Sequence, residues 1–139
     1  MNLETAKKLK SEKKLHLVGD GAQMMTDIKM LALSFSYYHD VDQKKARELL
    51  LSAIHEYLAV INKNEQIQPY LYNRPFTANN VEIRIFVRKP DHSDIDRGKI
   101  CAASALEGAI RYDIRDPETD RLRTIATETY EEALSRAQF

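Results

Sequence analysis

The sequence predicts a single α+β domain in which one long helix packs on one face of an antiparallel sheet of about four strands, followed by a short C-terminal helix. Residues 81–88 alternate between apolar and charged side chains, and only Phe86 departs from this rule. Such a period of two is typical of a strand with one buried and one exposed face. Residues 46–61 carry apolar side chains at helical spacing, so this helix offers the apolar surface that the strand needs.

The N-terminal segment is rich in lysine. Residues 1–14 contain five lysines and two glutamates but almost no apolar stripe. We therefore expect a solvated helix within a polar, partly flexible arm that covers residues 1–20. Gly19 and Gly21, on either side of an aspartate, favour a loop. The single α+β domain is then expected over residues 21–139.

Two elements follow this loop. Residues 28–38 are apolar on both faces of an extended chain and end in aromatic side chains, which predicts a strand buried on both sides. A helix is the alternative, because the period does not separate the two in a short apolar run. The long helix is expected over about 43–65. Asp40 or Asp42 can accept hydrogen bonds from the free N–H groups of its first turn.

The connection after the long helix combines two prolines with three aromatic residues. A solvated linker is rarely so aromatic. We therefore expect residues 69–77 to form a rigid, ordered connection, with Tyr70, Leu71 and Phe76 packed back onto the domain.

The last third of the chain has the pattern of short strands joined by turns. Three further strands are expected at residues 100–106, 110–115 and 121–125. Sequential strands joined by short turns are antiparallel neighbours. Thr129 and Glu132 have the spacing of a capping box, which predicts that a short helix begins there.

Composition limits the class of protein. The chain has 139 residues, with 21 Lys and Arg against 21 Asp and Glu. A balanced charge disfavours a dedicated binder of nucleic acid or anionic membranes. The single cysteine fits a reducing compartment, and no apolar run has the length of a signal peptide or a membrane span. We expect a cytoplasmic protein, with export by a route that uses no cleavable signal as the alternative.

Candidate catalytic and metal-binding residues are few. Cys101 and His92 are the one pair that suggests nucleophilic chemistry, as in a thiol-dependent hydrolase, but a core position for the cysteine is favoured. The acidic loop 91–98 departs from the spacing of a calcium-binding EF-hand. The four histidines lack metal-ligand spacing. We expect no catalytic residues, no metal and no cofactor, and we lean towards a protein that is not an enzyme.

The most promising recognition surface combines arginine and tyrosine. Arginines project from the exposed side of the later strands, Arg84 and Arg111 among them, although residues 81–125 hold equal numbers of basic and acidic side chains. Tyrosine and arginine are enriched in binding hot spots. We therefore expect a non-catalytic protein-interaction module, with a homodimer as the simplest partner. Its candidate contact residues are Tyr70, Tyr72, Arg74, Phe76, Arg84 and Arg111. Weak binding of nucleic acid or another anion by the arginine-bearing face is the alternative.

Two resemblances bear on this expectation. The order helix–three strands–helix looks like a double-stranded-RNA-binding domain, but residues 127–132 are acidic where such a domain places phosphate-binding lysines. The segments 69–71 and 75–77, with Asn80 and the strand 82–86, resemble a small group of uncharacterised bacterial proteins. That resemblance covers about residues 40–135 and implies no activity, cofactor or site.

Overall fold

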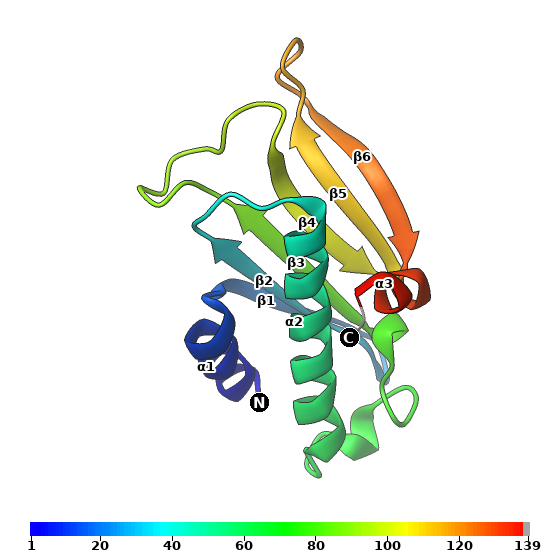
Figure 1. Ribbon diagram of the computed structural model, residues 1–139. Helices are drawn as coiled ribbons and strands as arrows, with labels where there is room; N and C mark the ends of the chain where they lie inside the picture. Colours follow the sequence, from blue (N-terminus) through cyan, green and yellow to red (C-terminus); the bar gives the residue numbers. More distant parts are fainter. Residues whose placement is uncertain (138–139) are drawn as a thin grey trace.

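The computed structural model describes residues 1–137, which form two layers (Figure 1). Three helices lie on one face of a single sheet: α1 (Asn2–Lys13), α2 (Gln43–Lys63) and α3 (Tyr130–Ala137). The strands are β1 (His16–Met24), β2 (Ile28–Tyr37), β3 (Val81–Val87), β4 (Ile100–Leu106), β5 (Ala109–Arg115) and β6 (Leu122–Thr129). Two short 3-10 turns, η1 (Gln68–Tyr70) and η2 (Ala78–Asn80), lie between α2 and β3. Among the helices of residues 1–137, none is long and apolar enough to cross a membrane.

The predicted fold class is confirmed, with a larger sheet than the sequence suggested. The sheet has six strands in the spatial order β1-β2-β3-β4-β5-β6, and all neighbours are antiparallel except β2 and β3. These two strands are parallel because α2 connects them as a crossover, whereas the other strands follow one another through turns. The predicted strand at 28–38 and the C-terminal helix are both present.

The segment expected to be a loop, around Gly19 and Gly21, is instead part of the edge strand β1. Gly19 pairs with Ser34 and Gly21 pairs with Ala32, so the ladder with β2 outweighs the weak strand propensity of glycine. The expected boundary between residues 20 and 21 thus falls inside β1. The N-terminal segment also contributes to the core, because Leu9 of α1 is 1% exposed.

Helix α2 is the centre of the helical layer. Its N-cap is Asp42, which accepts a hydrogen bond from the backbone N–H of Lys45 at 2.7 Å. Its apolar stripe is buried, including Leu50 and Ile54, and faces the buried side of β3 and β4. The alternation predicted for β3 is confirmed, since Val81, Ile83, Ile85 and Val87 are all buried.

The connection between α2 and β3 is ordered, as predicted. The side-chain amide of Asn62 donates to the carbonyl of Phe76 at 3.0 Å and accepts from its N–H at 2.8 Å. The N–H of Tyr72 donates to the carbonyl of Ile28 at 2.8 Å, which ties the segment to β2. Phe76 is buried, but Tyr70 is 59% exposed, so the expectation that Tyr70 packs back onto the domain is wrong.

Helix α3 is fixed by two devices. The predicted capping box is present: Thr129 Oγ1 accepts from the N–H of Glu132 at 3.1 Å, and Glu132 Oε1 accepts from the N–H of Thr129 at 2.9 Å. Beside it, the carboxylate of Glu128 is fully buried between α2, α3 and β5. This carboxylate joins both helices to the sheet.

Candidate functional site

The helices cover only one face of the sheet, and the other face is open (Figure 1). On β3 the buried residues alternate with Glu82, Arg84 and Phe86, whose side chains project from the open face. Phe86 is 39% exposed there, although an aromatic side chain is favoured in a buried position. The open face is therefore where this fold presents its unpaired apolar surface.

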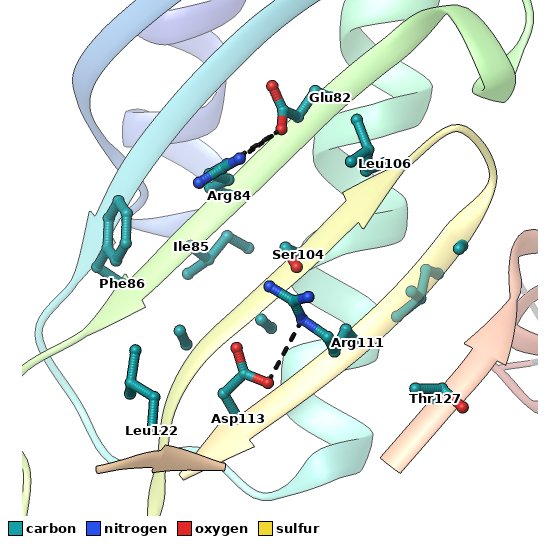
Figure 2. A pocket seen from close by; sticks show the side chains of 14 residues that line it. Glu82, Arg84, Ile85, Phe86, Ser104, Leu106, Arg111, Asp113, Leu122 and Thr127 are labelled. Atoms are coloured by element: carbon teal, nitrogen blue, oxygen red, sulfur yellow. Dashed lines mark hydrogen bonds and ion pairs between the residues drawn. The ribbon is translucent and has the colours of Figure 1, made fainter. Parts of the chain in front are cut away.

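A groove runs along β4 on this open face, and we call it the β4 groove (Figure 2). It has a volume of about 290 Å³. Ala102 and Ser104 of β4 form its floor, while larger side chains of β3 and β5 form its walls. Neighbouring strands lie ~4.8 Å apart, so the backbones of β3 and β5 are about 10 Å apart across this floor. The small side chains of β4 thus create a depression with the width of one strand-like chain.

Apolar side chains stand at both ends of the β4 groove. Leu106 lies at one end, and Phe86 and Leu122 lie near the other (Figure 2). Leu106 is 42% exposed and Leu122 is 59% exposed. A second hollow of about 200 Å³ continues beyond Phe86 and shares Phe86, Ala102 and Leu122 with the first. The depression therefore extends along most of β4.

Two arginines face each other across the middle of the β4 groove. Arg84 is paired in register with Ser104, and Ser104 is paired with Arg111, so both arginines flank the same floor residue. Arg84 donates to Glu82 Oε1 through Nε at 3.1 Å and through Nη2 at 2.8 Å. Arg111 Nε lies 3.5 Å from Asp113 Oδ1, which is a looser contact.

The charge that this face presents to solvent is positive, although each arginine has an acidic neighbour. The side chains of Arg84 and Arg111 are 53% and 58% exposed, whereas those of Glu82 and Asp113 are 14% and 10% exposed. The hydroxyl of Thr124 also donates to Asp113 Oδ1 at 2.7 Å, which holds this carboxylate against the sheet. The guanidinium groups therefore project from the surface, and the carboxylates lie recessed beside them.

Two of the six candidate contact residues, Arg84 and Arg111, line the β4 groove. Tyr70 and Tyr72 are exposed on the connection after α2, at 59% and 61%. Tyr72 packs against Lys29, whose Nζ lies 5.3 Å from the ring centroid. Arg74 is exposed too, but Phe76 is 2% exposed and belongs to the core, so its side chain is not accessible at the surface.

The remaining arginines of the later strands are mostly engaged in ion pairs at the turns. Arg88 contacts Asp94 at 3.0 Å, and Arg123 contacts Asp116 at 3.0 Å. Such exposed pairs contribute little to stability, but they neutralise the arginines beyond the groove. The open face is thus not a continuous cationic surface, because these arginines, like Arg84 and Arg111, each have an acidic neighbour.

The two residues considered for nucleophilic chemistry make different contacts. His92 stacks on Tyr38, with ring centroids 3.9 Å apart. Cys101 donates through Sγ to the backbone carbonyl of Asp113 at 3.6 Å. Burial is the main cause that raises the pKa of the Cys101 thiol above its ordinary value. Among the hydrogen bonds of residues 1–137, none joins Cys101 to His92, and a thiol with a raised pKa holds less of the thiolate that acts as a nucleophile.

The comparisons identify no relative. No protein-family model, no curated protein and no solved structure was found to match this chain.

The floor of the β4 groove is not evident from the sequence alone. The run of small residues at 102–105 is its signal, but by itself this run predicts only part of the strand at 100–106. Small side chains flanked by strands that carry arginine and phenylalanine indicate a depression once the strand order is known.

Proposed function

We propose that this protein is a non-catalytic protein-interaction module that binds an extended segment of a partner protein in the β4 groove. The observation that carries the proposal is the exposure of Phe86, Leu106 and Leu122 around a floor of small residues on an otherwise uncovered sheet face. Exposed apolar side chains that gather at one depression are typical of binding surfaces, whereas scattered ones need no explanation.

The shape of the depression favours a chain over a compact small molecule. Ligand pockets usually enclose ~300–1,000 Å³ and bury most of their ligand. The β4 groove, at about 290 Å³, stands at the lower end of this range, but it is open to solvent and continues into the second hollow. Strand β4 has seven residues, and at ~3.3 Å per residue this gives a length of about 23 Å. An extended segment of six or so residues matches this length and the strand-wide floor.

The connection that carries Tyr70, Tyr72 and Arg74 is a second candidate contact surface for the same partner. Its support is the exposure of both tyrosines on a backbone that hydrogen bonds hold in place. A pre-ordered surface loses less conformational entropy on binding than a mobile one. Self-association through either surface remains part of the proposal, with a second copy of the chain as the simplest partner.

A groove-filling variant tests the proposal. Ser104→Leu places a larger side chain on the floor of the β4 groove without entering the core, because Ser104 points to the open face. The matched control is Ser11→Leu, the same change at an exposed position of α1, outside the residues that line the groove.

A phage library of random decapeptides would be selected on the unmodified protein, and each enriched peptide would be measured against both variants by fluorescence anisotropy. We expect peptides that lose binding to Ser104→Leu and keep it to Ser11→Leu. Enriched peptides that bind Ser104→Leu as well as the unmodified protein would contradict the proposal, and so would a selection that yields no binder. Size-exclusion chromatography with light scattering, on the same three proteins, tests self-association.

A further inference from the structure

We infer that the segment bound in the β4 groove is acidic, with one Asp or Glu between Arg84 and Arg111 and an apolar residue two positions to either side. This inference rests on the proposed function and names the partner's chemistry. It assigns the two arginines to recognition of a carboxylate, and it assigns Leu106, Phe86 and Leu122 to the flanking apolar side chains.

The position of the carboxylate follows from the register of three strands. Arg84, Ser104 and Arg111 occupy one row across β3, β4 and β5. Figure 2 shows the two guanidinium groups on opposite sides of the Ser104 hydroxyl. A carboxylate above Ser104 would accept hydrogen bonds from both walls and from the floor. Arginine is well suited to this role, because its planar group presents five N–H donors.

Free donors are available in this row. Arg84 directs Nε and Nη2 to Glu82, which leaves Nη1 without a hydrogen bond among residues 1–137. Arg111 has only the 3.5 Å contact between its Nε and Asp113 among the ion pairs and hydrogen bonds of the described chain. An incoming carboxylate would therefore find donors on both walls without displacing Glu82 or Asp113. Glu82 holds Arg84 in place through two hydrogen bonds, whereas Arg111 keeps most of its donors free.

The apolar flanks follow from the period of an extended chain. In an extended segment, side chains at positions i and i±2 point to the same side, about 6.6 Å apart. On the protein, Phe86 lies two residues from Arg84 along β3, and Leu106 lies two residues from Ser104 along β4. Leu122 stands beside Phe86 at the same end (Figure 2). An acidic side chain over Ser104 thus places its i±2 neighbours against Leu106 at one end and against Phe86 and Leu122 at the other.

Two other occupants fit less well. A helix is ~10–12 Å across with its side chains. The backbones of β3 and β5 are only about 10 Å apart, and their side chains narrow the groove further, so a helix is too wide for it. A nucleic acid would need positive charge along its backbone, but the arginines beyond the groove are paired with aspartates. Among the described residues that line the groove, free guanidinium donors lie on both sides of Ser104 and at no other point along β4, so the groove matches one carboxylate.

The test uses the enriched decapeptides and the intact protein. The sequences themselves are the first readout, and we expect an Asp or Glu with apolar residues at both i−2 and i+2. The best peptide is then synthesised in two forms, unchanged and with its central acid replaced by the corresponding amide. We expect the amide form to bind about 10-fold to 100-fold more weakly, because charge-assisted hydrogen bonds are lost.

The matching change on the protein is Arg84→Gln with Arg111→Gln, and Arg121→Gln is the control because Arg121 is an exposed arginine outside the residues that line the groove. The double variant should lose as much affinity for the acidic peptide as the unmodified protein loses when the acid is replaced by the amide. The affinity for the amide form should be the same for the double variant and the unmodified protein. Thermal unfolding of both variants checks that they fold. Because all three arginines are exposed, we expect unchanged midpoints.

The outcomes separate the inference from the proposed function. Peptides that depend on Ser104 but carry no acid, or that bind equally well as amides, would overturn the inference and leave the proposed function standing. Peptides indifferent to Ser104→Leu would overturn both. Binding of a single-stranded oligonucleotide that competes with the peptide and is lost in the arginine double variant would also overturn the inference, since the site would then recognise phosphate.

Discussion

The substitution Glu128→Gln removes the buried charge that joins helices α2 and α3 to the sheet. The carboxylate is 0% exposed as a side chain. It accepts from Arg47 at 2.6 and 2.9 Å, from the Tyr112 hydroxyl at 3.0 Å and from Arg136 at 3.0 Å. A glutamine keeps the shape, but it replaces one acceptor oxygen by an N–H₂ group that faces donors. Arg47, whose side chain is 12% exposed, would be left with a buried and poorly compensated charge.

The magnitude follows from this geometry. Removing one partner of a buried ion pair costs about 3–5 kcal/mol. For a chain of 139 residues, each kcal/mol lowers the midpoint of thermal unfolding by about 4 °C, so we expect a decrease of roughly 10–20 °C. The matched control is Arg136→Ala, because that side chain is 51% exposed. Its loss should cost about 1 kcal/mol or less.

Urea unfolding followed by circular dichroism measures these differences. Converting the pair to apolar residues, Glu128→Leu with Arg47→Met, should cost less than Glu128→Gln alone, because no buried charge remains unpaired. If Glu128→Gln lowers the free energy of unfolding by less than about 1 kcal/mol, with an unchanged dependence on urea concentration, the role given to this carboxylate is refuted.

Four further predictions follow from the same structure. Hydrogen bonds from Arg47 are the main cause that lowers the pKa of Glu128 below its ordinary value of 4.5, so its contribution to stability is present above that pH and is lost as the pH falls through the lowered pKa. Urea titrations at pH 3 to 7 should show this fall, and the fall should be smaller in Glu128→Gln. Leu50→Ala should cost ~2–5 kcal/mol in the same assay, because it opens a cavity under the helical layer; a cost near zero would place Leu50 outside the core. Tyr72→Ala with Arg74→Ala should leave the thermal midpoint nearly unchanged, because both side chains are exposed, and a cooperative loss of structure would show instead that they are structural. Iodoacetamide should modify Cys101 more slowly than free cysteine at pH 7.5, because burial raises the pKa of the thiol. Faster modification would instead support the alternative that the protein is a thiol-dependent hydrolase.

The elements with a strong period were predictable from the sequence. Strand β3 shows its alternation directly, and α2 shows its apolar stripe, while its N-cap could be narrowed to Asp40 or Asp42 before the structure identified Asp42. The capping box at Thr129 also identified the start of α3 within one residue. In each case the local pattern and the tertiary packing favour the same conformation, so local reasoning succeeds.

The edge strand β1 and the parallel pairing were not predictable in this way. The glycines of β1 favour a turn locally, and only the ladder with β2 makes them a strand. The position of β2 beside β3 depends on the crossover through α2, which no local pattern encodes.

The candidate site was predictable in part. Arg84 and Arg111 were identified because they alternate with apolar residues on exposed positions. Their position across Ser104 depends on strand order and register, which the sequence does not display. Phe76 shows the opposite case. An aromatic residue in a connection between two elements can be a contact or a core residue, and here the hydrogen bonds of Asn62 direct it inward.

The most direct measurement is a titration of the ¹⁵N-labelled protein with the best acidic decapeptide, followed by backbone amide chemical shifts. A segment bound in the β4 groove should shift the amides of β3, β4 and β5 most strongly, with the largest changes around Arg84, Ser104 and Arg111, and should leave α2 almost unchanged. Shifts confined to residues 70–74, or to the helical face, would contradict binding in the β4 groove.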